Sequence, residues 1–213
     1  MDKRIIKTKK VIYSSLNKIL LKKEIGDISI TELCESAQIS RKTFYLHYSS
    51  IYDVIEEQFA ILDEDIETRI ISFKKCISGD ENVCFQNIII EEMLKKEQLI
   101  CGLSLQKNDS LLKSQYCQKQ IDIIARLLME KFEIKKDQSI LYSNFIVTTI
   151  WTCLRNWMIN NKDIPLEELK EFIFQFCILL YTNIDLFLVL PLFHKISPQL
   201  IQKLFFLSCS FLS

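Results

Sequence analysis

ISITELCESAQISRKTFYLHYSSIYDV, at residues 28–54, is the stretch of the sequence that decides the fold. It is predicted to form two short helices joined by a tight turn. Ser29 and Glu32 have the spacing of a capping box, in which the hydroxyl binds a helical amide and the carboxylate reaches back to the cap. Apolar residues then recur at helical spacing, at Ile30, Leu33, Cys34 and Ala37. The first helix therefore has one buried face, and Gln38 and Ile39 follow it as the turn.

The second helix begins after Ser40, which is a plausible cap, and its first turn carries Arg41, Lys42 and Thr43. Such a turn offers charged and hydroxyl donors to a polyanion, as a DNA-recognition helix does. Apolar and aromatic side chains of the same helix are expected in the core, namely Phe44, Leu46 and Tyr48. The alternative is a solvated amphipathic hairpin, which gives no reason for Thr43, Tyr45 and His47 to share one short helix.

This stretch resembles the DNA-binding domain of the TetR/AcrR family of bacterial transcriptional regulators. The family's pattern is matched by a hydroxyl cap, an acidic residue, an apolar residue with Ala, a turn and a hydroxyl- and aromatic-rich helix: Ser29, Glu32, Leu33, Ala37, Ile39, Ser40, Thr43, Phe44, Tyr45, His47 and Tyr48. Three positions depart from it. Gln38 stands where the family usually has Gly, Cys34 replaces Ala, and Ile51 replaces a Lys that touches a phosphate.

The resemblance implies a homodimeric regulator, most simply a repressor, that binds a pseudo-palindromic DNA operator and responds to an unknown small-molecule effector. Arg41, Lys42 and Thr43 are suited to base edges in the major groove. Tyr45 and His47 are expected to bind phosphates, as those positions do in the family, assisted by Lys9 and Lys10. The alternative regulator is a co-regulator of similar fold that a protein partner controls.

The distribution of charge supports a DNA-binding end of the chain, although the net charge does not. The chain carries 27 basic and 27 acidic residues and so balances at formal zero. Basic residues gather before the motif, at Lys3, Arg4, Lys7, Lys9, Lys10, Lys18, Lys22 and Lys23. Acidic residues gather after it, at Glu56, Glu57, Asp63, Glu64, Asp65 and Glu67. We expect the basic segment to hold phosphates and the acidic one to point away from DNA.

Three Gly and three Pro among 213 residues predict an all-α protein, because long stretches lack helix breakers. Three parts are expected: an N-terminal three-helix helix-turn-helix DNA-binding domain (1–49), a helical ligand-binding and dimerisation domain (50–181) and an apolar extension (182–213). Besides the two motif helices, helices are predicted at about 3–23, 50–76, 83–96, 98–106, 111–132, 137–160 and 165–181.

The segment 150–165 holds a Trp-containing helix end, a short loop and Pro165, and it resembles the end of many TetR-family ligand domains. In that family the last two helices pair with their copies in a second subunit. The last helix here is apolar nearly all round, which requires burial on several sides. Homodimerisation through the helices around 137–160 and 165–181 is therefore expected, and burial within a larger monomer core is the alternative.

An effector pocket is expected among the central helices. Candidate lining residues are aromatic, namely Phe85, Tyr116, Tyr142, Phe145 and Trp151, although a residue of this kind is more often plain core than pocket lining. Such a lining favours an apolar or aromatic effector.

The segment 182–213 contains two apolar runs that are interrupted by Pro191, His194, Lys195 and Pro198. Neither run reaches the roughly 20 apolar residues that span a bilayer, so no membrane span is expected. An extra helix on the dimer, a peripheral membrane contact and a segment without settled structure remain alternatives.

The sequence contains few candidate catalytic residues. Two histidines, no nucleotide-binding loop and no paired C-x-x-C motif argue against an enzyme, a metal site and a cofactor. The eight cysteines are typical of small apolar core residues in a reduced cytoplasm, with a thiol-based redox sensor as the alternative. An enzyme on a helical scaffold is the rival from another class, and paired ionisable groups in a pocket would favour it.

Overall fold

The computed structural model describes residues 3–76, 85–106, 110–132 and 135–181, and in these ranges the regular structure is helical. This confirms the predicted all-α class, and each predicted helix boundary outside the motif lies within three residues of the observed one. The chain divides into two compact units, an N-terminal unit at 1–123 and a C-terminal unit at 124–213. The predicted domain boundaries after residues 49 and 181 stay predictions, and the extension at 182–213 lies outside the described residues.

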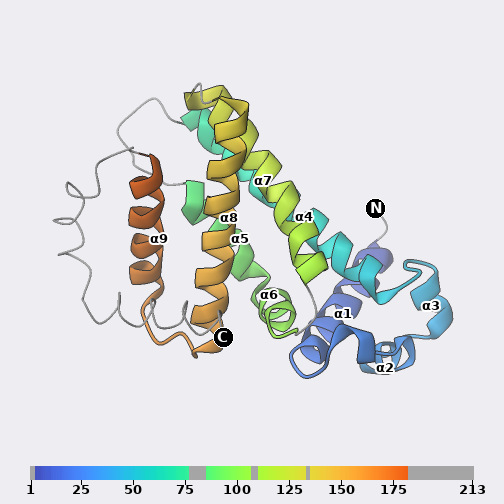
Figure 1. Cartoon of the computed structure of the whole chain (residues 1–213). Coiled ribbons are helices and arrows are strands. Elements are labelled where there is room, and N and C mark those ends of the chain that lie inside the picture. The colour runs from blue at the N-terminus through green and yellow to red at the C-terminus, as the bar shows by residue number, and fades with distance from the viewer. Residues whose placement is uncertain (1–2, 77–84, 107–109, 133–134, 182–213) are drawn as a thin grey trace. The chain divides into compact units, whose positions relative to one another are not determined.

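The N-terminal unit begins with α1 (Lys3–Leu20), a 3-10 turn η1 (Ile25–Asp27), α2 (Ile30–Ser36) and α3 (Arg41–Tyr45). These helices gather around the beginning of α4 (Ile51–Cys76), as Figure 1 shows. Large apolar side chains from all four helices are fully buried there, including Leu16, Leu33, Phe44 and Ile55. Their burial holds the two motif helices on one common core.

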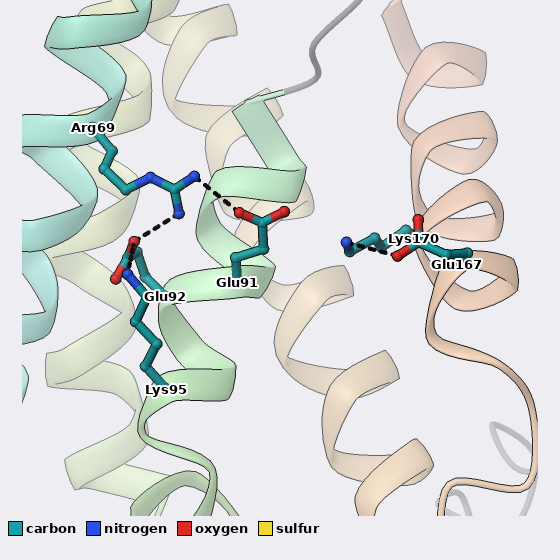
Figure 2. Close-up of polar contacts among 6 residues, drawn as sticks. All are labelled: Arg69, Glu91, Glu92, Lys95, Glu167 and Lys170. Carbon is teal, nitrogen blue, oxygen red and sulfur yellow. Dashed lines mark hydrogen bonds and ion pairs between the residues drawn. The ribbon is translucent and has the colours of Figure 1, made fainter.

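The same unit continues with α5 (Phe85–Lys95), α6 (Glu97–Ser104) and the first part of α7 (Ser110–Phe132). Arg69 of α4 joins α5 through two carboxylates, at 2.9 Å from Glu91 and 2.7 Å from Glu92 (Figure 2). Burial alone would raise the pKa of Glu92, but hydrogen bonds from Lys95 and Arg69 outweigh it and lower that pKa. A buried carboxylate is thus retained as a charged, paired group between two helices.

The end of α6 is fastened to the end of α1. The amide nitrogen of Gln106 donates to the carbonyl oxygens of Lys23 at 3.1 Å and Gly102 at 3.0 Å, and its oxygen accepts from the Ile25 backbone at 2.7 Å. The absence of a side chain at Gly102 permits this approach, because a Cβ there would lie 2.7 Å from the Cβ of Leu20. One side chain and one glycine therefore determine how closely these helices approach.

The described part of the C-terminal unit contains the last turns of α7 and an antiparallel pair, α8 (Lys136–Ile159) and α9 (Leu166–Tyr181) (Figure 1). Asn161 and Lys162 adopt positive φ values of 56° and 58° in the connecting loop. The indole nitrogen of Trp157 donates to the carbonyl oxygen of Ile164 at 2.8 Å and so closes the loop. On α9, Lys170 pairs with Glu167 one turn earlier at 3.0 Å (Figure 2). None of the described helices is long and apolar enough to cross a membrane.

Candidate nucleic-acid interface

The two motif helices form the predicted helix-turn-helix. Ser29 caps α2 by accepting from the Glu32 backbone at 3.1 Å, while the Glu32 carboxylate accepts from Lys23 at 2.7 Å instead of reaching back to the cap. Gln38 makes the turn with a φ of 54°, in the left-handed region that favours glycine. The backbone of Ile39 then donates to the carbonyl of Cys34 at 3.0 Å, which turns the chain into α3.

The recognition helix α3 is held by its cap and by buried aromatic rings. Ser40 accepts from the Thr43 backbone at 3.0 Å, and the hydroxyls of these two residues lie 2.8 Å apart. Phe44 and Tyr48 are buried, whereas Arg41, Lys42 and Tyr45 are exposed. The helix is shorter than predicted and ends at Tyr45, and the following turn donates the amides of His47 and Tyr48 to the carbonyl of Phe44.

The prediction that Leu46 packs in the core is wrong, since 72% of this residue is exposed. Phe44 occupies the buried face, and residues two apart on a helix point about 200° apart. Leu46 therefore lies on the outer face, one turn after Lys42.

Glu57 of α4 is the centre of a polar cluster behind the recognition helix. Its carboxylate accepts hydrogen bonds from Lys9 at 2.5 Å, from the hydroxyl of Tyr13 at 2.5 Å and from the hydroxyl of Tyr48. Burial alone would raise the pKa of Glu57, but the bonds from Lys9 and the two tyrosines lower it. Burial and the bond to Glu57 raise the pKa of Tyr13 to about 12. This cluster, the Glu57 hub, joins α1, α4 and the end of the recognition helix.

The hub changes what can be expected of the two lysines predicted to assist at phosphates. Lys9 is paired with Glu57, and its ammonium lies 5.5 Å from the centre of the Tyr48 ring. Lys10 is exposed and lines an open hollow of about 560 Å³ on α1, together with Lys3, Lys7, Lys18 and Ser36 among others. The structure thus places the two adjacent lysines in different surroundings, and Lys10 alone of the two faces outward.

Sequence reasoning missed two features of this region. The Glu57 hub ties Lys9 and Tyr13 of α1 to residues 35 to 48 positions further along the chain, so no local pattern could show it. A capping arrangement at the start of α4 did have a local signal: the Asp53 carboxylate accepts from the Ser49 backbone at 2.7 Å, and the Asp53 backbone donates to the Ser50 hydroxyl at 3.2 Å.

Ile51, at the position where the family has a phosphate-binding lysine, is buried.

The candidate pocket aromatics fall in different parts of the chain. Tyr116 belongs to the N-terminal unit, where its ring stacks on that of Phe59 with centres 3.7 Å apart. Tyr142, Phe145 and Trp151 lie on α8 in the C-terminal unit, Trp151 buried and the other two half-buried. The side chain of Phe85 lies outside the described residues. No group of acidic, His or Cys side chains in the described ranges could hold a metal ion.

Solved structures with the same architecture are known, although the sequence matches no family model and no curated protein. A protein described as a TetR-family transcriptional regulator, from Syntrophomonas wolfei, aligns with a TM-score of 0.72 and 15% identity over 84% of this chain and 97% of its own. The fatty acid degradation regulator FadR from Bacillus halodurans aligns with a TM-score of 0.61 and 14% identity over 84% and 96%. A TetR transcriptional regulator from Streptococcus agalactiae gives 0.54 and 19% over 83% and 96%. The chain therefore has the fold of the TetR-family transcriptional regulators.

Proposed function

We propose that this protein is a sequence-specific DNA-binding transcriptional regulator that reads its operator with α3. The observation that carries the proposal is the two-sided construction of this helix. Phe44 and Tyr48 anchor one side in the core, and Arg41, Lys42 and Tyr45 are exposed on the other. A short, capped helix with buried anchors presents cationic donors to a groove in a fixed orientation.

Each polar side chain of this region has a role in the proposal. Arg41 and Lys42 supply donors for guanine edges, and Tyr45 and His47 bind phosphates on either side. Lys10 supplies a further cation from α1, whereas Lys9 acts through the Glu57 hub by holding α1 against the end of α3.

The operator is proposed to be pseudo-palindromic and to be bound by a homodimer. Two copies of α3 would then enter successive major grooves about 34–36 Å apart. Dimerisation is assigned to α8 and α9, and apolar side chains that α8 leaves exposed in the single chain, at Ile140, Leu141 and Ile159, support this assignment. The proposal is completed by repression that a small-molecule effector relieves. An effector that binds more tightly when the two copies of α3 are wrongly spaced for the operator shifts the population away from the DNA-bound form.

The test is selection of bound sequences from a random DNA pool by the purified protein at two salt concentrations. Enrichment of a two-fold-symmetric site, with affinity that falls steeply as salt rises, is expected, since bound lysines and arginines release counterions. A double Arg41→Ala, Lys42→Ala variant is the matched control, because both side chains are exposed and their loss leaves the core intact. Absence of any enriched site from a folded protein would contradict direct operator binding and favour a partner-controlled co-regulator.

A further inference from the structure

The outer face of the recognition helix is half cationic and half apolar. Arg41 and Lys42 occupy its first turn, and Tyr45 and Leu46 follow, with 50% and 72% of each residue exposed. Of the large apolar residues that the structure describes, Leu46 is the most exposed. Lys42 and Leu46 are four positions apart and so lie one above the other on the same face, the backbone of Leu46 donating to the carbonyl of Lys42 at 3.1 Å.

We propose that Leu46 determines sequence specificity by packing against the 5-methyl group of a thymine in the operator. This inference rests on the proposed function and extends it to one base. The thymine methyl is the apolar feature of the base edges in the major groove, and contact with it is read by apolar side chains. Leu46 stands one turn from a cation that reaches the same groove, so its apolar surface is covered when α3 enters the groove.

Within α3 the residue that carries a methyl group is Thr43, and its surroundings differ from those of Leu46 at the C-terminal cap. Its hydroxyl lies 2.8 Å from that of Ser40, and the side chain is half-buried at the beginning of the helix. The cap therefore restricts the rotation of Thr43, while Leu46 stands clear of the core. A Thr43→Ser variant keeps the hydroxyl and removes only the methyl, which makes it the matched control.

The experiment compares the selected operator with versions in which one thymine at a time, in both half-sites, is replaced by deoxyuridine. This change removes only the 5-methyl group. Dissociation constants are measured at one salt concentration for the wild type, Leu46→Ala, Leu46→Met and Thr43→Ser. Thermal unfolding of each variant shows that the fold is kept.

At one thymine position the wild type is expected to lose about fourfold in affinity per half-site, the fold-change that matches burial of one methyl-sized group. Leu46→Ala binds the thymine and deoxyuridine forms equally at that position, while Leu46→Met and Thr43→Ser keep the wild-type discrimination.

Two outcomes overturn the inference while leaving the proposed function in place. One is an enriched operator with no thymine whose replacement weakens the wild type. The other is discrimination that Leu46→Ala retains at every thymine. Failure to recover any operator instead overturns the proposed function itself, and with it this inference.

Discussion

Tyr45 and Tyr48 are three positions apart in the sequence, but their hydroxyl groups have opposite surroundings. Tyr45 is half exposed on the outer face of α3, whereas Tyr48 is buried and donates its hydroxyl proton to Glu57. Removal of one hydroxyl thus tests contact with DNA, and removal of the other tests the support behind the helix.

We expect Tyr45→Phe to weaken binding to operator and random DNA alike, because it removes a phosphate contact that carries no sequence information. Its free energy of unfolding should stay within about 0.5 kcal/mol of the wild type, as at other surface positions. Tyr48→Phe should instead lower that free energy by about 1.5–3 kcal/mol, because a hydrogen bond to a charged group is lost. Urea unfolding and DNA titration measure the stability and the DNA affinity of both variants. Equal free energies of unfolding for the two variants would refute the role of the hub.

Arg41 is expected to read a base. Arg41→Ala should cost about 1–3 kcal/mol at the operator and relax the preference at one position, since a bidentate contact to a base edge is lost. Repeated selection from the random pool shows the relaxed position. A uniform loss across all sequences would mean that Arg41 binds phosphate.

At the scale of elements, two joints of the N-terminal unit depend on a special backbone position. One is the turn at Gln38 before the recognition helix, and the other is the contact of α6 with α1 at Gly102. At each joint a single substitution should change the free energy of unfolding in a direction that can be predicted.

Gln38→Gly should stabilise the fold. The left-handed conformation costs a residue with a Cβ about 1–2 kcal/mol, and glycine adopts it freely at some cost in the entropy of the unfolded chain. A net gain of about 0.5–1 kcal/mol in thermal or urea unfolding is expected. Gln38→Ala, which keeps the Cβ, serves as the control and should show no such gain.

Gly102→Ala should destabilise the N-terminal unit by about 1–3 kcal/mol, the usual cost of an overpacked contact. The added Cβ would lie 3.2 Å from the backbone carbonyl carbon of Leu20, so α1 or α6 would have to shift. Gly26→Ala is the control, because nothing lies within 4 Å of a Cβ built at that position. Similar urea midpoints for the two variants would show that the contact at Gly102 has room for a methyl group.

At the scale of the whole molecule, stability should depend on pH through Asp63. This carboxylate of α4 is buried, 3.6 Å from Lys119 and 3.4 Å from the amide of Gln120 on α7. Burial, opposed by Lys119 and Gln120, raises its pKa from 3.8 to about 6. Since the folded state favours the protonated form, the stabilisation is full below about pH 4 and is lost as pH rises through about 6.

We therefore expect Asp63→Asn to stabilise the protein relative to the wild type by about 1–2 kcal/mol more at pH 7.5 than at pH 5, from the linkage of 1.36 kcal/mol per pKa unit. Urea unfolding at the two pH values measures the difference. Asp65→Asn, at an exposed position of the same helix, is the control. A difference that does not change with pH would mean that Asp63 stays ionised across this range.

The sequence by itself determined the all-α class, the approximate boundaries of the helices outside the motif and the two caps at Ser29 and Ser40. It also placed the turn at Gln38. All of these depend on residues within one or two turns of one another, so their physical causes lie in the local pattern. The DNA-facing role of Arg41, Lys42 and Tyr45 stays a prediction, but their exposure agrees with it.

Only the tertiary structure decided that Lys10 faces outward while Lys9 does not, and that Leu46 is exposed. Lys9 and Lys10 are equivalent in the sequence, and the carboxylate that captures Lys9 comes from Glu57, 48 positions away. Leu46 looks like core by composition, yet Phe44 already fills the buried face of the short helix. The contact of Gly102 with Leu20 is likewise invisible in a local pattern. Such features depend on which distant side chains meet, and that is set by the packing of the helices.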